Sequence, residues 1–274
     1  MLRRELADRL GDVVSIDPRQ GPETADVVSP GALEQEHLAG ADTVILAVPE
    51  PVALEALRTL TPLLRPDALL VETLSVKSRF ADSLGRLRPR FEVIGINPMF
   101  GPALEMRGRA VALIPYNAGE RAGRFSTMLS ERGAHLVELS PCAHDQATVL
   151  LQALPHLVIL AYTQVVRGSG VDFNEIVELA PPPASALLAL AARIADGNPH
   201  VYSEIQGANP YTAAGRASLA DELRRLSEAC TDPAALQAVL EDVEAGLNGS
   251  RDPLLAAADH IVSRSICDER SARG

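Results

Sequence analysis

The sequence is poor in cysteine and in aromatic residues. It has no tryptophan, and its three cysteines, Cys142, Cys230 and Cys267, lie far apart without a CxxC pair. This spacing excludes a zinc ribbon and a disulfide-stapled scaffold, and we predict no metal site. Scattered free cysteines are typical of a reducing cytosol, so we expect a cytoplasmic protein.

Basic residues and long apolar runs are also scarce. Lys and Arg number 25 against 36 Asp and Glu, which gives a net charge of -11. An acidic surface repels nucleic-acid phosphates and anionic lipids, so we expect neither as a partner. The apolar runs at 157–162 and 186–192 are too short to cross the ~30 Å of hydrocarbon in a bilayer.

The length of 274 residues suits two domains of ~150 residues each. In residues 1–140, short apolar strands alternate with helical stretches, which predicts a doubly wound, Rossmann-like parallel sheet. The expected strands are 13–17, 43–49, 68–75, 91–98, 111–116 and 134–139, and the expected helices include 2–10, 76–87 and 120–132. This part is predicted to be a dinucleotide-binding domain.

From residue 141 onward the pattern is entirely helical. Residues 141–274 are therefore predicted to form an all-helical domain. Its expected helices are 143–166, 185–197, 219–230, 233–247 and 253–266. Their apolar surfaces suit either a dimer interface or the core of a monomer.

Ligands of open parallel sheets bind beyond the carboxyl ends of the strands. In this sequence that edge is predicted to carry Asp17, residues 48–50, residues 75–77 and residues 97–99. Asp17 ends a predicted strand where nucleotide folds place an acid that binds the adenosine ribose. An aspartate in a turn before proline is the alternative.

The sequence has no G-x-G-x-x-G turn, whose glycines let backbone amides approach a pyrophosphate. The predicted domain begins at the helix that normally follows this turn. The first strand and the turn would therefore precede Met1, if the start codon has been assigned too far downstream. A loss of the pyrophosphate site is the other explanation.

Four segments together resemble the prephenate dehydrogenase family in order and spacing. They are AVPEPVALEAL (47–57), ETLSVKS (72–78), GINPMFGP (95–102) and HDQATVLLQALPHLVILAY (144–162). The resemblance implies a dinucleotide domain in residues 1–140 and NAD or NADP as cofactor. It also implies that the helical domain of residues 141–274 binds the substrate and forms a homodimer. The reaction that it implies is oxidative decarboxylation of a cyclohexadienyl dicarboxylate.

The same resemblance implies candidate site residues. Ser75 matches the family's active-site serine, beside the C4 substituent and the nicotinamide. Val48 and Pro49 are candidates for the cofactor side because they lie at the carboxyl end of a predicted strand. His156 matches a substrate-contacting histidine, and His144 a recurrent histidine near the domain junction. Ser75 and His144 could instead be helix caps, and His156 a buried core histidine.

Cations are needed to bind the two substrate carboxylates. Lys77 and Arg79 are candidates, with exposed helix positions as the alternative. In the family an arginine usually follows the position of Asn209, but here Pro210 follows. That leaves the carboxylate clamp unassigned, with Arg193 or Arg216 as substitutes and Tyr211 as a packing residue.

Asn97 is the informative departure from the family. Prephenate-oxidising members have a histidine there that binds the C4 hydroxyl and helps to remove its proton. Asparagine cannot be a general base, but its amide can accept or donate a hydrogen bond. An amine at C4 needs a base less, because its lone pair can expel the hydride directly.

The predicted reaction is therefore the NAD-dependent conversion of 4-amino-4-deoxyprephenate to 4-aminophenylpyruvate, as in relatives from specialised pathways. A prephenate or arogenate dehydrogenase that tolerates Asn97 is the first alternative. A cofactor-less relative with a regulatory or non-redox role is the second. NAD and NADP stay open, because Asp17 favours a free ribose hydroxyl whereas Arg19 suits a 2′-phosphate.

Overall fold

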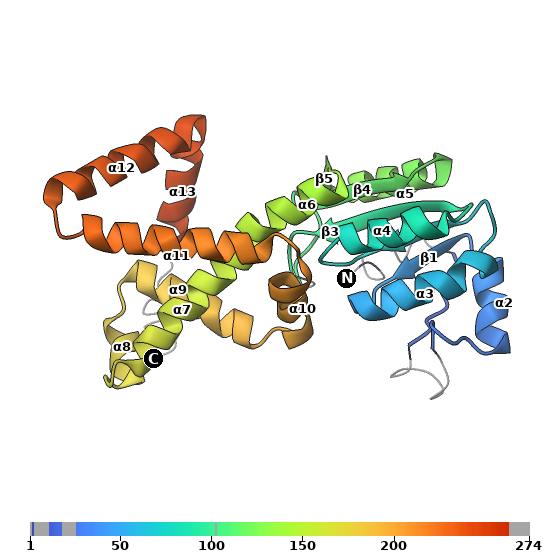
Figure 1. Cartoon of the computed structure of the whole chain (residues 1–274), viewed down its shortest axis with the longest axis horizontal. Coiled ribbons are helices and arrows are strands. Elements are labelled where there is room, and N and C mark those ends of the chain that lie inside the picture. The colour runs from blue at the N-terminus through green and yellow to red at the C-terminus, as the bar shows by residue number, and fades with distance from the viewer. Residues whose placement is uncertain (1, 3–10, 18–25, 102, 263–274) are drawn as a thin grey trace. The chain divides into compact units, whose positions relative to one another are not determined.

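The computed structural model describes residues 2, 11–17, 26–101 and 103–262 (Figure 1). The chain forms two compact units, each considered by itself below. The first unit contains Met1–Thr148 and His200–Pro210, and the second contains Val149–Pro199 and Tyr211–Gly274. The division thus falls eight residues after the predicted boundary at 140, and a later segment returns to the first unit.

A five-stranded sheet forms the centre of the first unit, in the order β1-β2-β3-β4-β5. The strands are β1 (Thr43–Leu46), β2 (Leu69–Glu72), β3 (Glu92–Pro98), β4 (Ala110–Asn117) and β5 (His135–Glu138). All neighbouring pairs are parallel except β3 and β4, which are antiparallel. The predicted α/β class is confirmed, but the sheet is mostly rather than wholly parallel.

The connection between β3 and β4 explains this reversal. A parallel return needs a crossover of about a dozen residues or more, usually with a helix. The described residues between Pro98 and Ala110 form turns and no helix. The chain therefore returns in the opposite direction.

The beginning of the chain differs from the prediction. The segment 11–17 is irregular, so the expected strand at 13–17 is wrong; Val13 and Val14 are exposed instead of buried in a sheet. The helix expected at 2–10 lies, apart from Leu2, outside the described residues. The helix α2 (Ala32–Gly40) was not predicted, because it buries only Leu38 and so lacks an apolar stripe.

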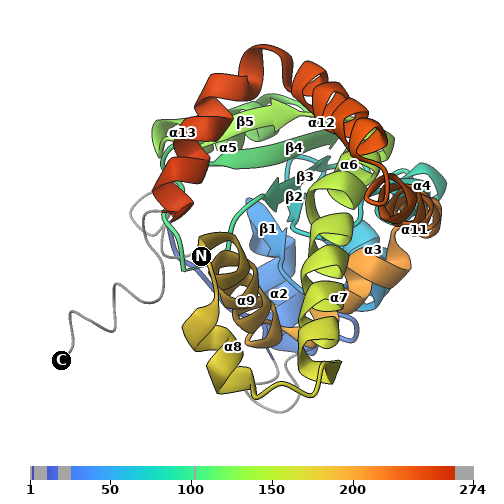
Figure 2. The same ribbon diagram turned by 90° about the vertical axis from the view of Figure 1, so that its left-hand side faces the viewer.

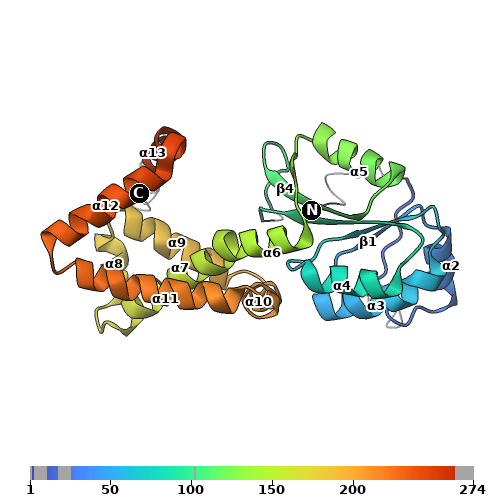
Figure 3. The same ribbon diagram turned by 45° about the horizontal axis from the view of Figure 1, so that its top comes forward.

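Helices cover both faces of the sheet, as a doubly wound architecture requires (Figures 2 and 3). On one face, α3 (Glu50–Leu63) and α4 (Ser78–Leu87) bury Leu57 and Phe80 with the sheet. On the other face, α5 (Glu120–Glu131) contributes Phe125 and Leu129 to a second apolar cluster. The carboxyl ends of the parallel strands are thus held between two packed layers.

The long helix predicted at 143–166 is present but interrupted. It comprises α6 (Pro141–Thr148), a π-helical turn η1 (Val149–Ala153) and α7 (Leu154–Gly168). Pro155, in the first turn of α7, has no N–H to donate to the preceding turn. This missing donor accounts for the local change from α to π hydrogen bonding.

The remaining helical elements are α8 (Phe173–Leu179), α9 (Pro182–Ala195), α10 (Pro199–Ser203), the π turn η2 (Glu204–Ala208), α11 (Thr212–Ala229), α12 (Pro233–Leu247), the 3-10 turn η3 (Asn248–Ser250) and α13 (Arg251–Val262). Three of these helices, α9, α10 and α12, begin at prolines, whose fixed φ suits the first helical position. The short helices α8 and α10 were not predicted, since their few turns carry too little periodicity.

The stretch Pro141–Gly168 is long and apolar enough to cross a membrane by length and composition alone. The earlier expectation considered only uninterrupted apolar runs and missed this. One such helix is weak support for a membrane span, because the core helix of a soluble protein passes the same test. Its first turns also carry His144 and Asp145, which are buried in hydrogen bonds within the first unit.

Gly95 in β3 lies opposite Glu72 in β2, and a Cβ atom there would be 2.0 Å from Glu72 Oε1. Because hydrogen bonds hold that carboxylate, we expect Gly95→Ala to lower the free energy of unfolding by about 1–3 kcal/mol. Gly123→Ala in α5 is the matched control, since its Cβ would meet no atom within 4 Å. The control is expected to gain about 0.5–1 kcal/mol. Urea unfolding measures both, and equal stability of the two variants would contradict the crowding.

Candidate active site

The carboxyl ends of β1, β2 and β3 lie at one edge of the sheet, because these strands are parallel neighbours. Val48 and Pro49 follow β1, Ser75 follows β2, and Asn97 is the penultimate residue of β3. Val48 and Ser75 are half-buried, and Asn97 is only 8% exposed. The structure thus places four of the predicted site residues along this edge.

Ser75 does not cap the following helix. α4 begins at Ser78 with Lys77 in the cap position and without a side-chain cap from its own segment. The Ser75 hydroxyl has no hydrogen-bond partner among the described residues, so it is available to a ligand. The helix-cap alternative for Ser75 is therefore not the arrangement seen.

The cap of α4 comes instead from Asp145 in α6. Its Oδ1 accepts from the backbone N–H of Lys77 at 2.8 Å. Its Oδ2 accepts from the backbone N–H of Ser78 at 2.9 Å and from Ser78 Oγ at 2.6 Å. A carboxylate is stabilised at a helix N-terminus by these free amides and by the helix dipole. Sequence analysis missed Asp145, although it stands in the HDQ motif.

His144 lies between Asp145 and Asn97. Its Nδ1 is 2.8 Å from Asp145 Oδ1, and its Nε2 is 3.0 Å from Asn97 Nδ2. His144 and Asp145 are 1% and 0% exposed, so water does not replace these partners. Two predicted site residues, Asn97 and His144, are thus brought into direct contact.

Opposing effects act on the ionisation of Asp145. Burial raises the pKa of its carboxyl, but hydrogen bonds from His144, Ser78 and the backbone N–H of Lys77 outweigh it. The net pKa is below the usual range. Asp145 is therefore an ionised carboxylate that accepts hydrogen bonds and donates none.

Lys77 is fully buried, contrary to the expectation of an exposed helix position or a substrate anchor. Its Nζ donates to Glu72 Oε1 at 2.8 Å, to Glu72 Oε2 at 2.9 Å and to the carbonyl of Ile96 at 3.0 Å. Burial lowers the pKa of Lys77, while the Glu72 carboxylate opposes that shift. These three bonds use all three N–H donors of the Lys77 ammonium, so none is left for a substrate carboxylate.

Tyr116 in β4 completes this buried cluster. Its hydroxyl donates to Glu72 Oε1 at 2.8 Å. Burial, together with the negative charge of Glu72, raises the pKa of Tyr116 well above its usual value. Lys77 also contacts both ends of the hydrogen-bonded series Asn97–His144–Asp145. Its side chain binds the carbonyl of Ile96, next to Asn97, and its backbone N–H binds Asp145.

Arg79 is paired with a buried acid. Its Nη1 is 2.6 Å from Oε2 of Glu50, the first residue of α3. Burial raises the pKa of Glu50, although Arg79 opposes that shift. Glu50 Oε1 is buried without a hydrogen-bond partner among the described residues, and the Glu50 backbone N–H donates to Glu204 Oε1 at 2.9 Å. Sequence analysis did not identify Glu50 or Glu204 as partners.

Asn209 is buried beside this network instead of preceding a substrate-binding arginine. Its Nδ2 donates to the backbone carbonyl of Asp145 at 2.7 Å and to Thr148 Oγ1 at 3.2 Å. These contacts hold α6 in place within the first unit. The motif around Asn209 therefore has a structural task in this chain.

The remaining predicted residues belong to other segments of the chain. Asp17 lies in the irregular segment 11–17, and Arg19 is outside the described residues. His156 in α7, Arg193 in α9 and Arg216 in α11 belong to the second unit. Burial lowers the pKa of His156, which favours its neutral form.

The edge offers some of the groups that a dinucleotide needs. Val48 and Pro49 supply an apolar wall, Ser75 a hydroxyl, and Glu50 Oε1 an unfilled acceptor. These groups fit the nicotinamide and ribose half of a cofactor, whereas the sequence contains no glycine turn for the pyrophosphate. No group of three His, Cys, Asp or Glu in the described part of the chain is placed to hold a metal ion.

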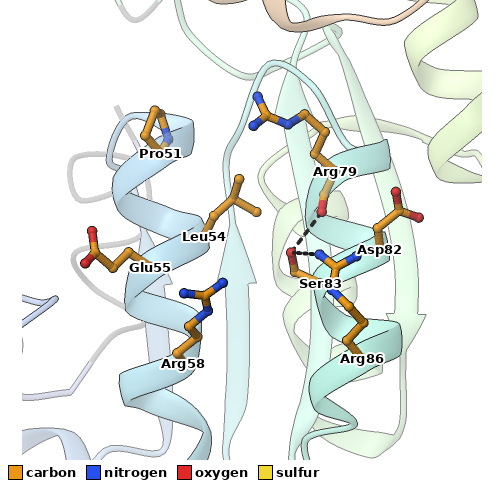
Figure 4. A pocket seen from close by; sticks show the side chains of 8 residues that line it. All are labelled: Pro51, Leu54, Glu55, Arg58, Arg79, Asp82, Ser83 and Arg86. Atoms are coloured by element: carbon orange, nitrogen blue, oxygen red, sulfur yellow. Dashed lines mark hydrogen bonds between the residues drawn. The ribbon is translucent and has the colours of Figure 1, made fainter.

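A separate open groove of about 570 Å³ lies between α3 and α4 (Figure 4). Its lining includes Arg58, Arg79 and Arg86, and Arg86 Nη2 donates to Ser83 Oγ at 3.0 Å. Of the predicted site residues in the described part of the chain, only Arg79 borders it. The groove is therefore distinct from the cluster around Asn97.

Comparison with known proteins gives one family for both units. The nucleotide-binding domain of prephenate dehydrogenase matches residues 14–137, and its dimerization domain matches residues 140–238. A 4-amino-4-deoxyprephenate dehydrogenase from Streptomyces pristinaespiralis is 43% identical over 204 residues, 74% of this chain and 69% of that protein. A probable arogenate/prephenate dehydrogenase from Methanocaldococcus jannaschii is 25% identical over 192 residues, 68% of this chain and 43% of that protein.

Solved structures share the fold. Prephenate dehydrogenase from A. aeolicus, in complex with hydroxyphenyl propionate and NAD+, superposes with a TM-score of 0.68 and 21% identity, covering 89% of this chain and 90% of that one. Synechocystis arogenate dehydrogenase superposes with a TM-score of 0.59 and 26% identity, covering 80% and 81%.

The buried pair of Glu72 and Lys77 predicts a strong stability effect. Lys77→Met would leave the Glu72 carboxylate buried without its cation, so we expect a loss of about 3–5 kcal/mol in the free energy of unfolding. Urea unfolding followed by circular dichroism measures this loss. The control Arg124→Met removes an exposed pair with Glu120 and should change stability by no more than about 0.5 kcal/mol. If Lys77→Met were as stable as the control, Glu72 and Lys77 would not form a buried ion pair.

Proposed function

The chain belongs to the prephenate dehydrogenase family, and from this premise we propose that it oxidatively decarboxylates 4-amino-4-deoxyprephenate to 4-aminophenylpyruvate with NAD. The observation that carries the proposal is Asn97, a buried amide at the end of β3 where a proton-accepting histidine would serve a hydroxyl substrate. The Streptomyces pristinaespiralis relative supports the same substrate, since it is 43% identical. Glu50 Oε1 and Ser75 support the cofactor at the neighbouring strand ends.

The chemistry explains why an amide suffices. As hydride leaves C4 and carbon dioxide leaves C1, the electron pair from the broken C1 bond restores a neutral aromatic ring. Bound NAD supplies the hydride acceptor. Positive charge develops on the C4 substituent, and nitrogen carries that charge more readily than oxygen. An amine substrate therefore depends less on a general base than a hydroxyl substrate does.

The side chains have separate proposed tasks. Asn97 Oδ1 accepts an N–H of the C4 amine, which orients the amine lone pair toward the breaking bond. Ser75 is proposed to offer its hydroxyl as a hydrogen-bonding group beside the C4 substituent and the nicotinamide. Val48 and Pro49 line the cofactor side of the site. His156 is proposed to contact the substrate.

Reduced-cofactor absorbance tests the substrate directly. The purified chain receives NAD with 4-amino-4-deoxyprephenate in one reaction and with prephenate in another. We expect the amino compound to be oxidised with much the higher kcat/KM. Asn97→His restores a base and should raise prephenate oxidation by about 10²-fold or more.

Asn97→Ala is the control, because it removes the amide without supplying a base. It should lower turnover of the amino compound and gain none with prephenate. Wild-type protein that oxidises prephenate as well as the amino compound would identify a prephenate dehydrogenase instead. Absence of turnover with either substrate would favour the cofactor-less alternative.

We propose in addition that the helical unit forms a homodimer. The chain contains the family's dimerization domain. Most of the exposed large apolar side chains belong to this unit, including Leu151, Val165 and Leu179 at 64%, 74% and 82% exposure. The concentration of such side chains in one unit is what a surface covered by a second copy would require.

Sedimentation equilibrium should give twice the chain mass of 29.1 kDa. Val165→Glu places a charge on the exposed side of α7, and we expect it to weaken the dimer by at least tenfold in Kd. Leu33→Glu is the matched control on α2 of the first unit, where the side chain is 61% exposed. A wild-type mass of one chain would refute the homodimer.

A further inference from the structure

We propose that Asp145 is a positioning residue: acting through His144, it fixes which end of the Asn97 amide faces the substrate, and so favours an amine over a hydroxyl at C4. The specificity role rests on the proposed function, whereas the orienting role rests on the hydrogen bonds alone. In neither role does Asp145 touch the reacting atoms.

The first step is the proton on the His144 ring. Asp145 Oδ1 accepts from Lys77 N and lies 2.8 Å from His144 Nδ1. Asp145 Oδ2 accepts from Ser78 N and Ser78 Oγ. Because an ionised carboxylate has no proton to donate, His144 Nδ1 must carry the hydrogen of their shared bond.

The second step is the direction of the amide. The amide nitrogen of Asn97 lies 3.0 Å from His144 Nε2. An amide NH₂ group can only donate, so Nε2 is the acceptor of this bond and carries no proton. The carbonyl oxygen Oδ1 is thereby directed away from His144 and is left for a ligand.

The third step is the rigidity of the arrangement. His144 is 1% exposed, so its ring cannot exchange Asp145 for water. Asp145 is held by the α4 amides and its backbone carbonyl by Asn209 Nδ2 at 2.7 Å. Lys77 Nζ holds the carbonyl of Ile96, directly before Asn97, at 3.0 Å. The Asn97 end of this series of hydrogen bonds is thus fixed through β3, and the Asp145 end is fixed by the start of α4 and by Asn209.

The consequence for specificity follows from the lone pairs of the substituent. A neutral amine has one lone pair, which must stay free to expel the hydride. If Asn97 presented its NH₂ group, that group would bind the lone pair and oppose the reaction. A hydroxyl oxygen has two lone pairs and would keep one free. Holding Oδ1 toward the substrate therefore protects the amine reaction in particular.

Asp145→Asn tests this directly, because it keeps the shape of the side chain and adds an NH₂ donor. That donor can face Nδ1, which moves the ring proton to Nε2 and forces the Asn97 amide to turn over. We expect ¹⁵N NMR of the imidazoles to show His144 protonated at Nδ1 in the wild type and at Nε2 in the variant. The lack of the His144 signals in His144→Phe assigns them.

The kinetic expectation is a fall of about 10²-fold or more in kcat for the amino substrate. A wrong tautomer costs about 10⁴-fold where the histidine itself transfers the proton, and His144 acts one residue removed from the reacting atoms. The kcat ratio of amino substrate to prephenate should fall as well, while KM changes little. Asp172→Asn is the matched control, since Asp172 caps α8 in the second unit and asparagine also caps helices. It should change neither the spectrum nor the ratio.

His144→Phe provides a second variant if Asp145→Asn does not fold. It removes the Nε2 acceptor but leaves the α4 hydrogen bonds to Asp145, so the freed amide should lower the same ratio. A wild-type ring protonated at Nε2 would overturn the orienting role. An unchanged substrate ratio in a folded variant would overturn the specificity role. If the wild type oxidises neither compound, the proposed function and the specificity role both fail, and the NMR result alone decides the orienting role.

Discussion

The buried ion pair of Glu72 and Lys77 is the interaction on which the rest of the site depends. Neither charge is stable in the interior alone, because desolvation of a single ion costs several kcal/mol. The pair is viable because Tyr116 and the carbonyl of Ile96 fill the remaining hydrogen-bonding positions. It ties the end of β2 to β3 and fixes the turn that enters α4.

From that turn, the structure extends to Asp145, which lies 68 positions further along the chain than Lys77. The carboxylate accepts hydrogen bonds from the backbone amides at the start of α4, and it is one of the contacts that hold α6 at the sheet edge. The same carboxylate sets the proton position on His144. The same set of hydrogen bonds therefore caps α4 and orients the His144 ring.

This arrangement separates two kinds of substrate recognition. A histidine at the position of Asn97 would offer proton transfer, whereas an amide offers only the direction of a hydrogen bond. The direction of the Asn97 hydrogen bond can select a substrate only if the amide group cannot rotate by half a turn. The buried contact with His144 at 3.0 Å supplies that restriction. An asparagine in the family's histidine position is thus best understood together with the residues behind it.

The sequence by itself determined the α/β class, the five strands from residue 43 onward, the helical second half and the family, because apolar periodicity and short motifs are local. It also marked Asn97 and His144, since a departure from a motif is visible without coordinates. Only the tertiary structure decided that β4 runs antiparallel, that residues 13–17 form no strand, and that Lys77 is buried. The direction of a strand depends on its connection, and the burial of a charge depends on partners distant in the chain. Asp145 was not predicted for the same reason, because the backbone amides that it binds belong to a helix far from it in sequence.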